Sequence, residues 1–599
     1  MFLLVAVNAK YIHSNPAIYS LRGFVKEEQR QQVMLAEYTI NQTLSSILAD
    51  IYKRKPSVIG FSCYIWNWEM IREILEELPK LLPNTDIWLG GPEVSFDAPE
   101  LLKKYPSVKG VMIGEGEATF AELLDLYLEK NWSSKNISEE KFKKVSGLCL
   151  RSGYTPMREL TNMSELPFLY DDLQQFENRI IYYESSRGCP YRCSYCLSSI
   201  DKKVRIRDFS VVERELAFFL ENKVSQVKFV DRTFNCDHDH AMKIWNYINE
   251  HDNGVTNFHF EISADILRED EIALLNSMRP GLVQLEIGVQ TTNPQTIKAI
   301  DRVMNVEKLE AIVAAVHRGN NIHQHLDLIA GLPYEDYESF GRSFDRVYAM
   351  EPQQLQLGFL KVLKGSPMSE RAEEYGLAYM GRPPYEVLYT KWLPYDDVLR
   401  LKDVEEMVEI YYNSNQFTHT LPFLVKAFKG PFEMFEKLAE FYREKGYFTN
   451  SPARAYRYHV LLDFCKEYNN VNLPVYKELL LFDMYLRENL KSRPEFAIDL
   501  SESEIKSQIR SFYQMEDEQR LYLTDYAGYD WKQLSKMTHL EPFSYAVWDV
   551  TQLKNAASVL DEKVFLLFDY KNRSPLTGEA KTQIVKTQIV KSEGYRDGE

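Results

Sequence analysis

ESSRGCPYRCSYCLSS, residues 184–199, places Cys189, Cys193 and Cys196 in C-x3-C-x2-C spacing on a loop just after a predicted strand. Three thiolates hold three irons of a [4Fe–4S] cube and leave the fourth iron open for substrate or cofactor. A structural zinc site is the alternative, but zinc usually takes four protein ligands, and no fourth cysteine or close histidine completes such a set. The stretch therefore predicts an iron–sulfur cluster with one open iron.

The composition is that of an ordinary globular protein. The chain has 599 residues, of which 45% are hydrophobic and 26% are charged, and its formal net charge is −16. These values exclude collagen-like, mucin-like and wholly disordered classes. The acidic balance does not favour general nucleic-acid binding, although a local basic channel stays open as an alternative.

The cysteines and the apolar runs indicate in which cellular compartment the protein is expected. Seven cysteines, three of them crowded into one loop, do not make a disulfide scaffold and indicate a reducing environment. The opening MFLLVAV has no basic residue before it, and no later apolar run approaches the length of a membrane span. We therefore expect a cytoplasmic protein without a secretory signal or membrane span.

The first 135 residues alternate short apolar runs with amphipathic stretches, which is typical of a parallel sheet covered by helices. We predict an α/β domain of doubly wound, Rossmann-like type, with its ligand at the carboxyl ends of the strands. The five predicted strands are FLLVAVNA (2–9), QVMLAEY (32–38), SVIGFSCYI (57–65), DIWLGGP (86–92) and GVMIGEG (110–116).

Residues 136–180 are polar and irregular, and we interpret them as a linker with a small hairpin around GLCLRSGYTPM (147–157). Strand–helix alternation returns in residues 181–380 and predicts a partial (β/α)6 barrel with its function at the C-terminal strand ends. Its six predicted strands are IIYYESS (180–186), QVKFVDR (226–232), NFHFEIS (257–263), LVQLEIGVQ (282–290), HQHLDLIAGL (323–332) and QLQLGFLKV (354–362).

Long helical patterns dominate residues 381–575, and we predict a mostly α-helical C-terminal domain with one late strand, VFLLFDY (564–570). Residues 576–599 contain KTQIV twice in tandem within a polar segment. We expect this tail to be disordered.

The three-cysteine loop resembles that of the radical S-adenosylmethionine (SAM) superfamily, and Tyr195 before the last cysteine fits the same pattern. The resemblance implies that the open iron chelates the amino and carboxylate groups of SAM. Electron transfer from the cluster then cleaves SAM to a 5′-deoxyadenosyl radical. In place of the family's glycine-glycine-glutamate, the strand ending in KFVDRTFN offers Asp231, a carboxylate that can accept from the SAM ammonium.

Polar residues also follow the later barrel strands, and their spacing resembles that of oxygen-independent coproporphyrinogen oxidase and its relatives. By that resemblance they hold the methionyl, ribose or adenine portions of SAM, and Arg302 is the natural partner for a carboxylate. A surface or loop ion pair is the alternative for each residue taken alone. The four residues are Glu261, Gln290, Arg302 and Asp327.

The first domain resembles the cobalamin-binding domain of cobalamin-dependent radical SAM enzymes. The resembling stretches are FSCYIWN (61–67), LGGPEVSF (89–96) and IGEGEATF (113–120), each directly after a predicted strand. Glycines there permit the close backbone approach that a corrin demands, although turns also explain glycine pairs. The implied cobalamin contacts are Ser62, Cys63, Asn67, Gly90, Gly91, Glu93, Gly114, Glu115, Gly116 and Glu117.

Histidine usage bears on the cobalt ligand. The Asp-x-His-x-x-Gly motif is absent, and His13 is the one histidine before His238. The resemblance implies cobalamin without a histidine lower ligand, so we interpret His13 as a loop or interface histidine. The run from Cys236 to His240 resembles a metal cluster, but it lies at a predicted helix start where Asp237 can cap.

Three cysteines outside the triplet have a simpler interpretation. Cys149 and Cys465 are interpreted as isolated core thiols, and Cys63 either faces the corrin or is a core thiol as well.

These observations predict a cobalamin-dependent radical SAM enzyme that methylates an unactivated carbon, with the cofactors carrying the difficult step. Radical cyclisation or ring rearrangement and a SAM-only radical enzyme are the alternatives. A cobalamin sensor or carrier is a non-enzyme alternative, against which the intact triplet argues. We expect a reducing partner such as flavodoxin or ferredoxin. The substrate is a small molecule, a lipid, a peptide or a modified nucleoside.

Overall fold

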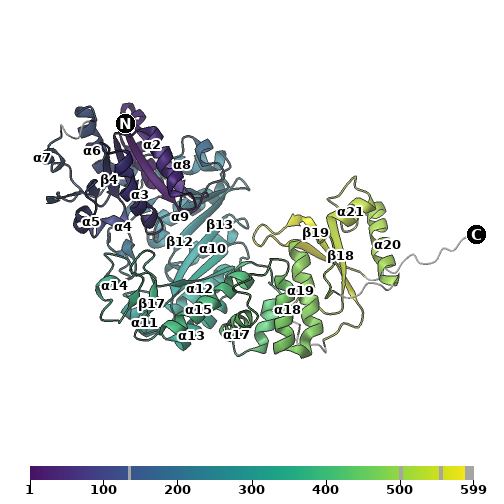
Figure 1. Ribbon diagram of the computed structural model, residues 1–599. Helices are drawn as coiled ribbons and strands as arrows, with labels where there is room; N and C mark the ends of the chain where they lie inside the picture. Colours follow the sequence, from purple (N-terminus) through teal and green to yellow (C-terminus); the bar gives the residue numbers. More distant parts are fainter. Residues whose placement is uncertain (133–136, 498–502, 552, 554–557, 587–599) are drawn as a thin grey trace, which may run out of the picture. The chain divides into compact units, whose positions relative to one another are not determined.

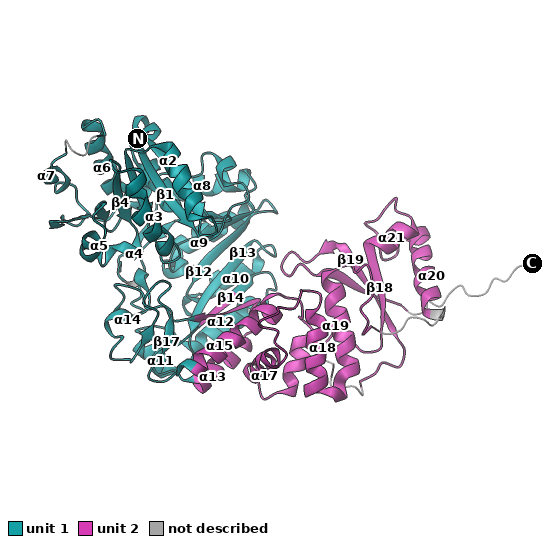
Figure 2. Ribbon diagram, viewed as in Figure 1, with its two compact units in different colours: residues 1–324, 329–336, 359–395 teal, residues 325–328, 337–358, 396–599 magenta. Residues whose placement is uncertain are grey.

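The computed structural model describes residues 1–132, 137–497, 503–551, 553 and 558–586 (Figure 1). It divides into two compact units, which Figure 2 colours separately. Unit 1 comprises residues 1–324, 329–336 and 359–395, and unit 2 comprises residues 325–328, 337–358 and 396–599. None of the helices within the described ranges has the length and hydropathy needed to cross a membrane.

Unit 1 begins with a seven-stranded sheet in the order β2-β1-β3-β4-β5-β6-β7. The first five strands are parallel, as the sequence predicted, and the last two form the hairpin expected in the linker, which extends the first sheet in antiparallel fashion. The strands are β1 (Phe2–Asn8), β2 (Val33–Thr39), β3 (Val58–Ser62), β4 (Asp86–Gly90), β5 (Val108–Met112), β6 (Leu148–Leu150) and β7 (Gly153–Tyr154).

Both faces of this sheet are covered, which explains its continuous apolar strands. Alternate residues of β1 point to opposite faces: Leu3, Val5 and Val7 join one hydrophobic core, and Phe2 and Leu4 join the other. The helices that supply these cores are α2 (Leu44–Arg54), α3 (Trp68–Leu81) and α5 (Ala98–Lys104) on one face, and α1 (Pro16–Phe24) and α6 (Glu117–Glu129) on the other. The domain is doubly wound, as predicted.

The second parallel sheet of unit 1 contains neighbouring strands in the order β8-β11-β12-β13. All six strands predicted for this region are present, and the residues of the last two belong partly to unit 1 and partly to unit 2. The strands are β8 (Ile181–Tyr183), β11 (Gln226–Phe229), β12 (Asn257–Ile262), β13 (Val283–Gln290), β14 (His323–Ala330) and β15 (Gln354–Phe359). Helices follow them, including α8 (Phe209–Glu221), α9 (His238–Glu250), α10 (Glu269–Ser277) and α12 (Val306–His317).

The C-terminal part of unit 2 is mainly helical, as expected, and it also contains an antiparallel sheet in the order β18-β19-β20. The strand predicted at residues 564–570 is part of β19. The principal elements are α17 (Pro431–Glu444), α18 (Arg457–Tyr468), α19 (Leu473–Arg487), α20 (Ser503–Gln519), α21 (Trp531–Met537), β18 (Thr538–Phe543), β19 (Val564–Arg573) and β20 (Ala580–Val585).

The prediction that residues 576–599 are disordered is wrong for the beginning of this segment. Residues 580–585, the first KTQIV repeat and the residue before it, form β20 because they pair with β19 and bury Ala580 and Val585. A polar, low-complexity composition did not reveal this partner, which is supplied by tertiary structure. Residues 587–599, with the second repeat, lie outside the described residues.

Candidate functional site

The cysteine loop leaves β8 and is closed at its base by a two-strand hairpin, β9 (Ser186–Arg187) with β10 (Arg205–Ile206). Gly188 has φ +99°, and a Cβ there would lie 2.5 Å from the Lys203 carbonyl oxygen, so a glycine is needed before the first cysteine. The Cys189 N–H donates to the Asp201 carbonyl over 3.0 Å. These contacts fix the loop that presents the three thiols.

None of the three loop cysteines is in a disulfide, and Cys189 and Cys193 are buried. Cys189 Sγ lies 3.6 Å from Thr233 Oγ1, and Cys193 Sγ lies 3.7 Å from the Arg302 guanidinium. Burial raises the pKa of the Cys193 thiol, and the adjacent Arg302 charge opposes that rise. A cationic neighbour favours the thiolate form that metal binding requires.

Arg302 connects the cysteine loop to β13, the fourth barrel strand. Its Nη1 donates to the Tyr195 hydroxyl over 3.2 Å, and its Nη2 donates to the Gly288 carbonyl. Gln290 lies against the same backbone, with its Oε1 buried and without a hydrogen-bond partner among the described residues. The structure thus brings Tyr195, Gln290 and Arg302 together beside Cys193.

Asp231 requires a correction. We predicted that it accepts from the SAM ammonium, but the side chain is fully buried and already accepts from the Ser185 N–H at 2.9 Å and from the Ser185 and Ser186 hydroxyls at 2.6 Å. Burial raises its pKa to about 6, against the lowering effect of these hydrogen bonds. Asp231 therefore ties β11 to the start of the cysteine loop.

The two remaining predicted SAM residues are not joined to this group by any contact that we describe. Glu261 is on β12, in register with Glu286 of β13. Asp327 is on β14, where its Oδ1 lies 3.0 Å from His325 Nε2. Their assignment to SAM stays a prediction.

The sequence analysis did not predict a triad of ionisable side chains on three neighbouring barrel strands. Glu286 Oε2 lies 3.1 Å from Lys228 Nζ and 2.9 Å from His259 Nε2. Burial alone would raise the pKa of Glu286, but the hydrogen bond from His259 and the charge of Lys228 lower it to about 2. The available signal was a polar residue at alternate positions of the strands, as in QVKF and NFHF.

A cavity of about 570 Å³ lies at the carboxyl ends of the first sheet. Leu197, Ile200 and Asp201 of the cysteine loop form part of its wall. Gly91 has φ +112°, and a Cβ there would lie 2.4 Å from the Cys63 carbonyl oxygen, so the backbone itself forms this wall. Seven of the ten predicted cobalamin contacts line the cavity: Ser62, Gly90, Gly91, Gly114, Glu115, Gly116 and Glu117.

The other three predicted contacts do not line it, and each has a structural partner instead. Cys63 is fully buried in the core, with burial raising the pKa of its thiol. Asn67 is fully buried and donates to the carbonyls of Val7 and Ser62, which joins β1 to β3. Glu93 binds Lys364 and Tyr385. These side chains are engaged elsewhere in this structure, and their assignment to cobalamin stays a prediction.

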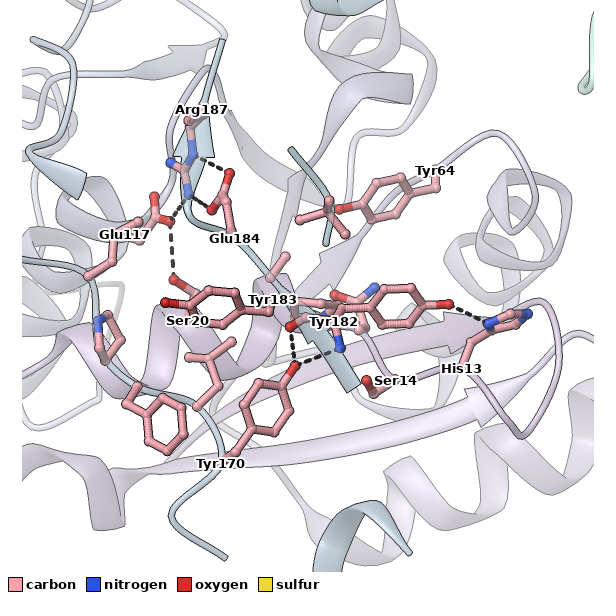
Figure 3. Close-up of a pocket in the computed structure, with 18 of the residues that line it drawn as sticks. His13, Ser14, Ser20, Tyr64, Glu117, Tyr170, Tyr182, Tyr183, Glu184 and Arg187 are labelled. Carbon is pink, nitrogen blue, oxygen red and sulfur yellow. Dashed lines mark hydrogen bonds and ion pairs between the residues drawn. The ribbon is translucent and has the colours of Figure 1, made fainter. Parts of the chain in front are cut away.

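A second cavity of about 500 Å³ adjoins the first, and both are lined by Ala17, Tyr64, Glu117 and Arg187. Figure 3 shows Arg187 between the carboxylates of Glu117 and Glu184, at 3.1 and 2.8 Å. Ala17, Arg187 and Tyr182 of this cavity were missed, because the sequence does not reveal that the first domain and β8 share a wall.

His13 lies in the second cavity. Its Nδ1 is 2.6 Å from the Tyr182 hydroxyl on β8, as drawn in Figure 3. Burial lowers the pKa of His13, so the imidazole is neutral near pH 7. A neutral imidazole nitrogen is a better acceptor than a phenol oxygen, and we therefore expect Tyr182 to donate to Nδ1.

The run from Cys236 to His240 does not converge on one point. Asp237 caps α9 by accepting from the His240 N–H at 2.9 Å, as predicted. His240 Nε2 lies 2.9 Å from Ser185 Oγ, whereas His238 Nε2 lies 3.1 Å from Asp270 on α10. The run therefore belongs to the helix start.

Family comparisons agree with this geometry. The B12 binding domain family matches residues 3–124, and the Radical SAM superfamily matches residues 183–347. The chain thus contains a segment that matches the B12-binding family, followed by one that matches the radical SAM superfamily. The B12-binding match spans the sheet that carries the larger cavity, and the radical SAM match spans the cysteine loop and Arg302. A third family, described as a protein of unknown function (DUF4080), matches residues 373–568.

Among similar proteins is the cobalamin-dependent radical SAM methyltransferase TokK of Streptomyces tokunonensis, 25% identical over 55% of this chain and 51% of TokK. Another is the 2-(S-pantetheinyl)-carbapenam-3-carboxylate methyltransferase of Streptantibioticus cattleyicolor, 24% identical over 54% of this chain and 50% of that protein. The chain thus spans about half the length of these relatives.

Solved structures share the fold. The cobalamin-dependent radical enzyme OxsB, with aqua-cobalamin and S-adenosylmethionine bound, has a TM-score of 0.55 and 17% identity over 80% of this chain and 78% of OxsB. The methyltransferase TsrM of Kitasatospora setae, with cobalamin and a [4Fe-4S] cluster bound, has a TM-score of 0.51 and 17% identity over 64% of this chain and 82% of TsrM.

Proposed function

We propose that this protein is a cobalamin-dependent radical SAM enzyme that methylates an unactivated carbon of its substrate. One observation carries the proposal: the loop that presents Cys189, Cys193 and Cys196 also forms a wall of the cavity at the carboxyl edge of the B12-binding sheet. A cluster and a corrinoid held there would serve one substrate. The names of TokK and TsrM support methylation as the reaction.

Each cofactor has residues suited to it. The three loop cysteines would hold the [4Fe–4S] cluster, and Arg302 with the buried Gln290 oxygen would take the polar groups of SAM. The two adjoining cavities match a corrinoid, which has two bulky parts, the ring and the nucleotide. When bound, the cluster supplies the electron that cleaves SAM to a 5′-deoxyadenosyl radical, and cobalamin supplies the methyl group.

The chain's own residues hold the parts of the two cofactor sites in position. Arg187 between Glu117 and Glu184 links the first domain to β8, and Glu115 links it to the hairpin through Arg205. Asp231 holds the base of the cysteine loop. Radical SAM chemistry needs a reductant, for which we propose a flavodoxin or ferredoxin, and we place the reaction in the reducing cytoplasm.

The test is anaerobic incubation of the reconstituted full chain with cobalamin, a reductant, methyl-labelled SAM and cell extract. We expect label in one class of small molecule, lipid, peptide or nucleoside, together with 5′-deoxyadenosine. Deoxyadenosine without label transfer in any fraction would instead favour a radical rearrangement. If protein with a full cluster formed neither labelled product nor 5′-deoxyadenosine, the enzyme proposal would be overturned.

Arg302→Gln is expected to keep the cluster and to weaken SAM binding about 10- to 100-fold. The loss of one charge-assisted contact costs about 1.5–3 kcal/mol. Titration of SAM into the anaerobic protein measures the change, and Arg371→Gln, an exposed arginine paired with Asp301, is the matched control. Unchanged affinity would make Arg302 a structural residue that only orders Tyr195.

His13→Ala is expected to leave the visible absorption and electron paramagnetic resonance spectra of bound cobalamin unchanged. When Tyr182 donates to His13 Nδ1, Nε2 carries the proton and has no lone pair for cobalt. Co(II) spectra of the wild-type protein and the variant provide the measurement. A nitrogen superhyperfine splitting that disappears in the variant would show that His13 is the lower ligand.

A further inference from the structure

The loop at residues 91–97 forms one side of the 570 Å³ cavity, through Gly91, Pro92, Ser95 and Phe96. It contains the short helix α4 (Pro92–Ser95). Its backbone is held by long hydrogen bonds: the N–H groups of Glu93 and Val94 each donate over 3.4 Å. Such bonds are weak, and besides the buried Val94, which packs in the core of the first domain, polar side-chain contacts hold the loop.

The side-chain contacts come from a segment almost 300 positions further along the chain. Lys364 Nζ lies 3.0 Å from Glu93 Oε1 and 2.8 Å from Asp97 Oδ2, and the Tyr385 hydroxyl donates to Glu93. Lys364 and Tyr385 are themselves on adjoining strands of backbone, because the Val362 N–H donates to the Tyr385 carbonyl over 3.0 Å. Tyr385 lies within the range matched by DUF4080.

Packing adds to these polar contacts. Gly365 has φ +76°, and a Cβ there would lie 2.2 Å from the ring of Phe96, which lines the cavity. The two segments therefore touch without room for a side chain. Glu93 is only 6% exposed, and a buried carboxylate is costly unless it is paired.

We propose that Lys364 and Tyr385 are positioning residues that form a latch on Glu93, and that a corrinoid enters and leaves the cavity when this latch opens. The proposal rests on the proposed function, because it takes the ligand of the cavity to be a corrinoid. It also assigns a role to the beginning of the DUF4080 region, which is to hold the cofactor loop of another domain. Opening exchanges the Glu93 contacts for water, so the latch is reversible.

The first experiment uses the full chain without cobalamin and measures hydrogen–deuterium exchange of the amides at 91–97. Lys364→Met is expected to raise their exchange rate at least tenfold, and Tyr385→Phe is expected to raise it less. Lys391→Met and Tyr389→Phe are matched controls, since the Lys391 ammonium donates to the Glu374 carbonyl and Tyr389 is half exposed. Unchanged exchange in both latch variants would overturn the proposal.

The second experiment measures release of hydroxocobalamin from the loaded full chain by visible absorbance. Lys364→Met is expected to release it at least tenfold faster than the wild type and Lys391→Met. Faster exchange with unchanged release would also overturn the proposal. A wild-type chain that retains no corrinoid would refute the proposed function instead, and the exchange measurement would then decide alone whether the latch exists.

Lys364→Met leaves the buried Glu93 carboxylate without its cation, which threatens folding. The double variant Glu93→Gln with Lys364→Met removes the stranded charge and the latch together. It is expected to melt at the wild-type temperature and to show the same fast exchange at 91–97. Slow, wild-type exchange in this folded double variant would overturn the latch.

Discussion

Cys193→Ala is expected to abolish both the iron–sulfur cluster and SAM cleavage after anaerobic reconstitution. Cys193 is buried between Cys189 and Cys196 on a loop fixed by Gly188, and its sulfur is the one that faces Arg302. A cube held by three thiolates that loses one of them has no replacement ligand at that corner. Iron and sulfide content, the brown absorbance and the yield of 5′-deoxyadenosine provide the measurements.

Cys465→Ala is the matched control for this variant. Cys465 is an equally buried thiol, but it is on the buried face of α18 in unit 2. We expect it to keep one cluster per chain and full SAM cleavage. If Cys193→Ala also cleaved SAM fully, the radical assignment would be wrong, since no other three cysteines are close together in the sequence.

Ala17→Trp is expected to lower cobalamin retention at least 100-fold while leaving the cluster and SAM cleavage in place. Ala17 is on α1 and lines both cavities at their junction, so an indole there would occupy the space that the corrinoid needs. A 100-fold change corresponds to about 2.7 kcal/mol, which is modest for a steric block. Absorbance of the protein after gel filtration with hydroxocobalamin measures retention.

Ala49→Trp places the same substitution at an exposed position of α2, away from both cavities. It is expected to retain cobalamin as the wild type does and to have a similar melting temperature. Cobalamin retained by Ala17→Trp, in folded protein, would mean that the corrinoid lies elsewhere. Such a result would favour the alternative that the protein is a radical enzyme that uses SAM without cobalamin.

Local sequence determined the parts of this protein that depend on neighbouring residues. The three cysteines lie within one loop, so their spacing alone predicted a cluster. Hydrophobic patterns predicted the strands and helices of both parallel sheets, because the apolar period within a strand or a helix spans only a few residues. Glycines after strands marked the cavity at residues 90–91 and 114–116, and at Gly91 a Cβ would clash with the Cys63 carbonyl oxygen.

Such patterns did not predict where the side chains of loop residues point. Asp231, Cys63, Asn67 and Glu93 stand at strand ends as predicted, yet each points to a structural partner rather than to a cofactor cavity. A residue's place after a strand follows from periodicity, but its direction follows from loop torsions and from the groups packed against it.

Only the tertiary structure decided which distant residues meet. Glu286 faces Lys228 because β11 and β13 flank the same strand, and Glu93 faces Tyr385 across 292 positions of sequence. β20 exists because β19 offers it an unpaired edge. Local propensity carries no information on such pairs, since the free energy that forms them comes from burying both partners together. The sequence by itself therefore determined the cofactor chemistry, whereas the shared wall, the triad of ionisable side chains and the latch required the folded chain.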